Sequence, residues 1–376
     1  MKKTNYQICH RCIMDTSDSD IFFDKNGICN HCLRYDTELP KRVFRGQDAE
    51  NKLNELIKGI KESGKNKEYD CLIGVSGGVD STYVAYLIKQ LGLRPLAVHF
   101  DNGWNSELAV SNIQKVLNKL DIDLYTYVID WEEFKSLQRS FLKASTPDSE
   151  IPTDHAINAL LFQEASKRNI RYIISGMNFV TESVLAEGWA YGHSDWKYIR
   201  SVHSLFENKK LANYPHFTFF NLFWWTFIKR IKSISILNYI DYNKKEVMDI
   251  LQNELGWVYY GGKHYESVYT RFFQGYILPQ KFGIDKRRAH LSNLILSGQI
   301  TRDEAIKEIG EIGYSSNLLA EDMIFVKKKL DFDDNSFCDL MNLPIKSFKD
   351  YPNNARWVTK LKQFVNFLRL KGLYSK

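Results

Sequence analysis

Residues 75–81, Val-Ser-Gly-Gly-Val-Asp-Ser, form the stretch best suited to chemistry. They follow the apolar run Cys71–Gly74 and precede the helical-looking run Thr82–Ile88, so a strand turns into a helix here. The free N–H groups at such a helix start and the positive end of its dipole favour an anion. The sequence therefore predicts a phosphate-binding loop.

The side chains of this loop fit a nucleotide and its metal ion. The two glycines let phosphate oxygens approach the backbone, and the two serine hydroxyls add donors. The aspartate offers a carboxylate to Mg²⁺ and is also a catalytic candidate. The residues predicted to bind ATP and Mg²⁺ are Ser76, Gly77, Gly78, Val79, Asp80 and Ser81.

The loop lacks the spacing and the lysine of a Walker loop. Ser76–Ser81 resembles instead the pyrophosphate loop (PP-loop) of the N-type ATP pyrophosphatases. That resemblance implies cleavage of ATP between the α and β phosphates, with AMP left on a substrate oxygen. An ordinary strand–helix turn is the alternative.

Composition bounds the protein class. The chain has 376 residues, of which 44% are hydrophobic and 26% charged, as expected for a globular protein with room for two domains. A net charge of +6 suits anionic substrates but does not argue for nucleic acid. No signal peptide and no spanning run of about 20 apolar residues is apparent, so we expect a cytoplasmic protein.

Four cysteines near the N-terminus have zinc-ligand spacing. Two Cys-x2-Cys pairs, Cys9 with Cys12 and Cys29 with Cys32, flank a loop, and four thiolates complete a tetrahedron around Zn²⁺. With every position filled by protein, the ion would be structural. His10 and His31 could replace a cysteine, and Gly27 fits the tight turn before the second pair.

Strands and helices then alternate, which predicts an α/β fold with a parallel sheet. After a helix over 49–63, we expect strands over 71–75, 95–100, 124–129 and 172–175, and helices over 82–91, 108–120 and 155–168. Residues 38–42 read as a polar linker, and Thr301 with Glu304 as a capping box. The predicted domains are a zinc module (1–45), a PP-loop ATP pyrophosphatase domain (46–260) and a helical region completing the site (261–376).

Residues just past the strand ends are the remaining nucleotide candidates, because ligands on parallel sheets lie at that edge. The stretch after the second strand resembles the one that borders adenosine in GMP synthetase, which implicates His99, Asp101 and Asn102. After the fourth strand, Gly176 would let adenine lie close to the backbone, and Asn178 offers polar contacts.

Two further carboxylates could face the substrate. Glu182 follows the fourth strand, and Asp154 precedes the helix before it. Either Thr153 or Asp154 is also expected to cap that helix.

Basic residues cluster later in the chain. Displacement at an α-phosphate needs cations to neutralise pyrophosphate. The catalytic candidates are Lys263, Lys286 and Arg287, with His264 as a base or donor, and Arg271 is a candidate for substrate binding. Solvated surface charge is the alternative.

Residues 217–228 are densely aromatic and are followed by Lys229, Arg230 and Lys232. The run is too short to span a bilayer. We favour packing between domains or docking to a protein over contact with a membrane surface.

Taken together, the cysteine motifs, GVSGGVDS, SGMNFVTE and FGIDKRRAHLS resemble the N-acetyl sugar amidotransferase family (WbpG- and PseA-like proteins). The resemblance implies an enzyme of lipopolysaccharide or related glycan biosynthesis. ATP would adenylate the acetamido oxygen of a nucleotide-linked sugar, and ammonia would displace AMP to give an acetamidino group.

No glutaminase motif accompanies these features. Family members are thought to draw ammonia from a HisH-like glutaminase with a HisF-like partner, and we expect the same here. Two alternatives are a tRNA thiolase, which usually needs a further reactive cysteine pair, and a non-catalytic scaffold of a sugar-modifying complex.

Overall fold

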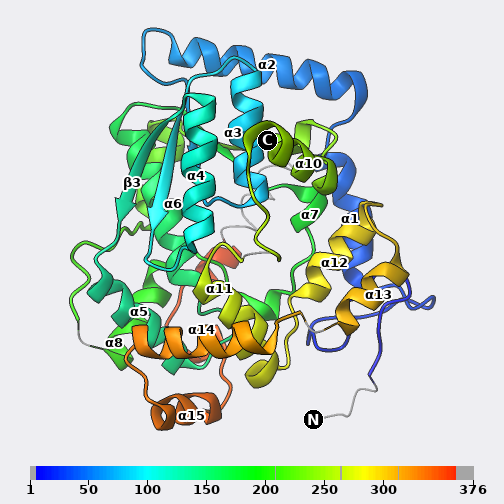
Figure 1. Ribbon diagram of the computed structural model, residues 1–376, viewed down its shortest axis with the longest axis vertical. Coiled ribbons are helices and arrows are strands. Elements are labelled where there is room, and N and C mark those ends of the chain that lie inside the picture. The colour runs from blue at the N-terminus through cyan, green and yellow to red at the C-terminus, as the bar shows by residue number, and fades with distance from the viewer. Residues whose placement is uncertain (1–5, 208, 263–264, 312, 361–376) are drawn as a thin grey trace.

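The fold is built on a five-stranded parallel sheet (Figure 1). The computed structural model describes residues 6–207, 209–262, 265–311 and 313–360. The strand order is β3-β2-β1-β4-β5. The strands are β1 (Cys71–Gly74), β2 (Pro95–Asp101), β3 (Asp123–Val128), β4 (Tyr172–Ser175) and β5 (Lys232–Ser235).

Helices cover both faces of the sheet, because its central strands are apolar on both sides. Cys71, Ile73 and Ile174 join one core with α2 (Gly46–Gly64), α3 (Val79–Gln90), α4 (Glu107–Leu120) and α10 (Lys244–Leu255). Leu72, Val98 and Ile173 join the opposite core with α5 (Trp131–Ala144), α6 (Ile151–Lys167) and α8 (Trp196–Phe206). The expected α/β class with a parallel sheet is confirmed.

The remaining helices lie around the ends of the sheet. In Figure 1 the C-terminal helices α12 and α13 lie close to α1, whereas α14 and α15 lie below the sheet. Their bounds are α1 (Asn30–Arg42), α7 (Phe179–Glu182), α9 (Phe219–Phe223), α11 (Val268–Phe272), α12 (Arg287–Leu296), α13 (Arg302–Gly310), α14 (Ser316–Lys329) and α15 (Asp334–Asn342). Short irregular helices are η1 (Glu187–Trp189), η2 (Trp224–Ile228), η3 (Ile236–Tyr239), η4 (Phe273–Phe282) and η5 (Phe348–Asp350).

Side-chain caps fix several helix starts. Ser106 accepts a hydrogen bond from the Ala109 N–H at the start of α4, and Asp130 does the same for the Glu133 N–H of α5. The predicted capping box is confirmed, since Thr301 and Glu304 cap α13 reciprocally.

Two local predictions are wrong. Residues 38–42 are the last residues of α1, with Pro40 inside the helix, and not a linker. Neither Thr153 nor Asp154 caps α6, because that helix already begins at Ile151 with Pro152 in its first turn, where proline's missing N–H costs little.

Among the described residues, no helix has both the length and the apolarity needed to cross a membrane.

Candidate active site

The loop between β1 and α3 presents its hydroxyls and N–H groups at the carboxyl edge of the sheet. Ser76 Oγ lies 3.2 Å from Ser81 Oγ and accepts a hydrogen bond from the Gly78 N–H at 3.3 Å. Ser81 Oγ also donates to the Gly78 carbonyl at 3.2 Å and accepts from the Ser76 N–H. Both hydroxyls therefore lie at the N-terminus of α3, which starts at Val79.

Gly77 can be replaced by no other residue without strain. Its φ is +80°, and a Cβ there would lie 2.7 Å from the Ala109 carbonyl oxygen of α4. The loop thus depends on the absence of a side chain for its shape and for its packing.

Gly78 faces two polar groups from later in the chain. A Cβ at Gly78 would lie 3.3 Å from Glu266 Oε1 and 3.4 Å from the Tyr260 hydroxyl. The pKa of Tyr260 is raised by burial and then by the charges of Glu266 and Asp80. The Glu266 carboxylate and the Tyr260 hydroxyl therefore lie beside the loop.

Trp257 and Tyr242 hold the loop from the far side. The buried Trp257 indole donates to the Gly77 carbonyl at 2.9 Å, and the Tyr242 hydroxyl donates to Asp80. The indole therefore satisfies the Gly77 carbonyl without help from a ligand. Neither residue was predicted, since isolated aromatics 162 to 180 positions away carry no sequence signal of this contact.

Two of the candidates at the end of β2, His99 and Asp101, are joined by hydrogen bonds through Asn105. His99 is buried, and its Nδ1 lies 3.0 Å from the Val75 carbonyl, which can only accept, so Nδ1 carries the proton. His99 Nε2 then accepts from the Asn105 amide at 3.2 Å, and that amide also donates to Asp101. Asn102 is buried and its Oδ1 accepts from the Trp104 N–H. This group shapes the strand end beside the loop.

The candidates after β4 also lie at this edge. A Cβ at Gly176 would lie 3.0 Å from the Asp80 carbonyl carbon and the Ser81 nitrogen, so the end of β4 touches the first turn of α3. Asn178 caps α7 by accepting from the Thr181 N–H at 2.9 Å. Glu182 lies close enough for its charge to raise the pKa of Tyr242, after burial and Asp80.

The candidate cations are paired with acidic partners. The Arg271 guanidinium donates two hydrogen bonds to the Asp322 carboxylate, from Nε at 2.6 Å and from Nη2 at 2.8 Å. Lys286 Nζ lies 2.9 Å from Glu150 and Arg287 lies 2.8 Å from Asp285. Lys263 and His264 lie outside the described residues. Asp154 is exposed in the first turn of α6.

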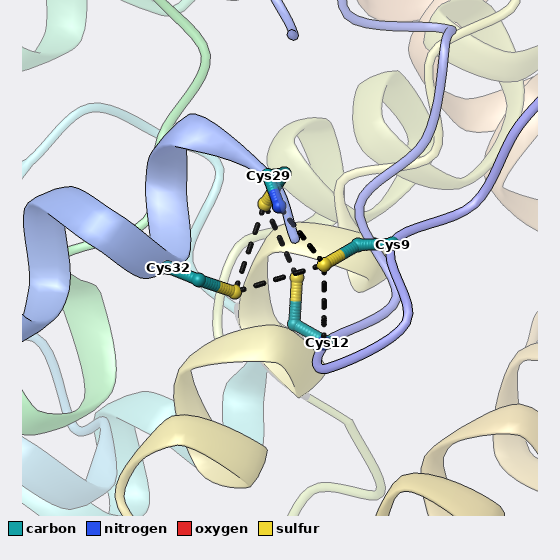
Figure 2. A group of neighbouring side chains, drawn as sticks. All are labelled: Cys9, Cys12, Cys29 and Cys32. Carbon is teal, nitrogen blue, oxygen red and sulfur yellow. Dashed lines mark hydrogen bonds between the residues drawn. The ribbon is translucent and has the colours of Figure 1, made fainter. Parts of the chain in front are cut away.

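The four N-terminal cysteines form a closed cluster, in which all four sulfurs point toward one another (Figure 2). The separations are 3.8 Å for Cys9–Cys32, 3.6 Å for Cys12–Cys29 and 3.7 Å for Cys29–Cys32. A Zn–S bond of about 2.3 Å in a regular tetrahedron requires sulfurs about 3.8 Å apart. The cluster is therefore compatible with zinc.

Neighbouring groups support this geometry. Backbone N–H groups of Arg11 and Cys29 point at Cys9 Sγ, at 3.4 and 3.3 Å. Gly27 has φ +75°, and a Cβ there would lie 2.5 Å from the His10 ring. His10 and His31 are not ligands: the former contacts the Asn26 carbonyl and the latter Asp18.

Two family models match the chain. "LPS biosynthesis protein WbpG-like, C-terminal domain" matches residues 266–363, and "Queuosine biosynthesis protein QueC" matches residues 70–211. The second model covers the first four strands and the loop of residues 75–81 between β1 and α3, which is called the nucleotide loop below.

Two characterised proteins share part of the sequence. The tRNA-specific 2-thiouridylase MnmA of Desulfosudis oleivorans is 30% identical over 78 residues, 20% of this chain and 22% of that protein. The 7-cyano-7-deazaguanine synthase of Sulfurimonas denitrificans is 32% identical over 85 residues, 22% of this chain and 37% of that protein. The matches thus span less than two-fifths of either relative's length.

Solved structures add only distant likeness. The match to the NH3-dependent NAD synthetase of Campylobacter jejuni covers 55% of this chain and 85% of the synthetase chain. Its sequence identity is 18% and its TM-score is 0.29. The match to the NMN synthetase of Francisella tularensis covers 50% of this chain and 99% of the synthetase chain, at 15% identity and a TM-score of 0.28. Likeness at this level says nothing about function. The chain thus has a QueC-like region that includes the loop between β1 and α3, and a WbpG-like region in its C-terminal part, in line with the likeness to PP-loop and WbpG-like proteins that the sequence predicted.

Proposed function

We propose that this protein is an ATP-dependent amidotransferase of nucleotide-linked N-acetyl sugars. It adenylates the acetamido oxygen and lets ammonia displace AMP, so that an acetamidino sugar, AMP and pyrophosphate are formed. The product would enter a bacterial surface glycan such as lipopolysaccharide.

One observation carries the proposal. The WbpG-like match begins at Glu266, and the carboxylate of that residue lies against Gly78 of the nucleotide loop. The backbone of the same segment binds the start of α4, where the N–H of the capping residue Ser106 donates to the Glu266 carbonyl at 2.8 Å. The first residue of the WbpG-like region therefore lies against the loop that we propose binds ATP, and this contact supports the proposal.

The chain's own residues support adenylation. The Ser76 and Ser81 hydroxyls and the N–H groups at the start of α3 would bind the departing pyrophosphate. As the acetamido oxygen attacks the α-phosphorus, the bond to the β-phosphate breaks. Ammonia then adds to the acetamido carbon, and the C–O bond to AMP breaks with loss of protons to water. AMP is a far better leaving group than the original amide oxygen.

The site also fits the expected metal ions. Asp80, with Glu266 across the loop, supplies the oxygen ligands that Mg²⁺ prefers. When bound, the ion would neutralise charge on the phosphates. The cysteine cluster would hold zinc as a structural ion, because four sulfurs complete its coordination.

We further propose that ammonia comes from a separate HisH-like glutaminase with a HisF-like partner. The two cysteines outside the zinc cluster are poor nucleophile candidates. Burial raises the pKa of the Cys71 thiol within β1, and Cys338 is exposed on α15. Purified protein that used glutamine as readily as ammonium would contradict this proposal.

The partial match to a tRNA 2-thiouridylase makes thiolation the second candidate. A thiolase usually needs a reactive cysteine pair near ATP. Cys71 and Cys338 do not form such a pair, since the former is buried in the central strand and the latter lies on an exposed helix. We therefore favour the amidotransferase.

The test is pyrophosphate release with ATP, Mg²⁺ and ammonium across a panel of nucleotide-linked acetamido sugars. Release should depend on one of the sugars and fall at least about a hundredfold in Asp80→Asn, because charge that stabilises the transition state is lost. Asp249→Asn, an exposed change on α10, is the matched control. Sugar-independent release, or release only with tRNA and a sulfur donor, would exclude the proposal.

A further inference from the structure

The segment formed by α9 and η2 exposes a dense group of large apolar side chains. The side chains of Phe220, Ile228 and Phe223 are 71%, 55% and 52% exposed, although all three are strongly apolar. The exposed apolar members of the segment are Phe219, Phe220, Phe223, Trp224, Phe227 and Ile228. Contiguous apolar surface of this kind marks an interaction site.

The segment is held firmly on the domain beneath it. Trp225 is buried and stacks on Phe162 of α6 with ring centroids 5.4 Å apart. Phe217 is also buried and stacks on His155, again of α6, at 4.3 Å. A capping box of Thr218 and Asn221 fixes the start of α9. Of the aromatic rings in residues 217–228, only Phe217 and Trp225 are buried. The expected packing between domains is therefore not found for the other aromatic rings of this segment.

The charge around this surface is entirely positive along the chain. From Lys209 to Ile240 the sequence has five Lys or Arg residues and no Asp or Glu. Three of them, Lys229, Arg230 and Lys232, directly follow the apolar residues and are exposed.

Neighbouring elements extend the positive charge. Strand β5 pairs with β4, and the Lys232 N–H donates to the Arg171 carbonyl at 2.8 Å. Burial and then the charge of Arg171 lower the pKa of Lys67, so these two cations lie close together. On α6, which packs against Phe217 and Trp225, Glu164 is bound by Arg168 at 3.1 Å.

We propose that this surface, residues 219–232, docks the protein to an anionic lipid membrane. A row of Phe, Trp and Ile side chains inserts into the headgroup–acyl boundary, and the flanking cations contact lipid phosphates. A protein groove would have to offer both apolar depth and a ring of acids. An anionic bilayer offers both along its whole surface, which is why it is the better match.

The placement leaves the active site accessible. The apolar segment leads into the first residue of β5, at the amino edge of the sheet, whereas the nucleotide loop lies at the carboxyl edge. Docking would therefore turn the nucleotide loop away from the bilayer and toward water.

The test is co-sedimentation of the full-length, zinc-loaded protein with phosphatidylcholine vesicles with and without phosphatidylglycerol. The protein should bind only the anionic vesicles, and added salt should weaken binding. Phe220→Ser with Phe227→Ser should reduce affinity at least about tenfold. Lys229→Gln and Lys232→Gln should each reduce it about fivefold.

Ile345→Ser is the matched control, because Ile345 is 61% exposed but lies after α15, outside this surface. Circular dichroism and pyrophosphate release report whether each variant is folded, and neither depends on vesicles. Absence of vesicle binding, equal binding to neutral vesicles, or unchanged binding by the double Phe variant would each overturn the proposal. Concentration-dependent dimers lost in that variant, without vesicle binding, would assign the surface to a second copy instead.

Discussion

At the scale of single residues, the nucleotide loop is constrained more by backbone geometry than by its reactive side chains. Gly77 has a left-handed φ and no room for a Cβ, and the Trp257 indole holds its carbonyl. The hydroxyls of Ser76 and Ser81 lie together at the start of α3 only while this turn keeps its shape. The loop motif was therefore readable from the sequence, whereas the indole that supports it was not.

Gly77→Ala should destabilise the fold both by straining the backbone and by placing a Cβ against the Ala109 carbonyl oxygen. Gly298 provides the matched control, since it has a similar φ of +74° but no atom within 4 Å of a Cβ. We expect Gly298→Ala to lower the free energy of unfolding by about 1 kcal/mol. Gly77→Ala should lower it by about 3 kcal/mol and abolish ATP binding. Urea denaturation and calorimetric titration with ATP measure these effects, and equal costs for the two variants would contradict the argument.

At the scale of elements, helices and strands with a clear apolar period were predictable and mixed ones were not. Strand β5 was missed because Lys232 and Ser233 face solvent and only Ile234 is apolar. The helical nature of residues 38–42 was missed because Pro40 usually ends a helix. The partners of Arg271 and Lys286 come from α14 and from before α6, and no local pattern reports such distant pairing.

The packing of α6 makes stability depend on pH. Burial lowers the pKa of His155 to about 4, while the hydrogen bond to the His193 carbonyl raises it in part. The charges of His193 and His216 have smaller lowering effects, and that of Asp195 a smaller raising one. The unfolded chain, with a histidine pKa of about 6.5, binds more protons between these values, so stability falls as the pH drops through that range. The loss should approach about 3 kcal/mol by pH ~4.

His155→Gln isolates this contribution, because it removes the titrating ring and keeps a hydrogen-bonding side chain. The free energy of unfolding, measured from neutral to mildly acidic pH, should fall less steeply in this variant than in the wild type. Parallel profiles would show that the buried ring does not govern the acid sensitivity.

At the scale of the whole molecule, the N-terminal cysteine cluster is tied to the C-terminal region. Arg302 of α13 donates to the carbonyls of Cys9 and Cys12, at 3.0 and 3.2 Å. The Ile13 N–H donates to Ser292 of α12, whose helix also contacts α7 beside the nucleotide edge. The cysteine spacing alone predicted the cluster, but not that it would hold these helices together. The domain boundaries at 45 and 260 remain predictions.

Loss of the metal should therefore destabilise more than the first 45 residues. Cys12→Ser should remove bound zinc and lower the free energy of unfolding by about 3 kcal/mol or more, with a lower Tm. Cys338→Ser, at an exposed cysteine on α15, should change neither. Metal analysis and thermal melts measure both, and full zinc content in Cys12→Ser would refute the assigned ligand set.

The contact between Trp257 and Gly77 joins residues 180 positions apart and has a consequence for synthesis. A ribosome releases the loop long before it makes the indole that shapes it, and longer still before it makes Arg302, which binds the cysteine loop. A nascent or truncated chain therefore has the motif without the finished turn. Truncation before Trp257 would therefore leave the loop motif without the indole that supports its Gly77 carbonyl.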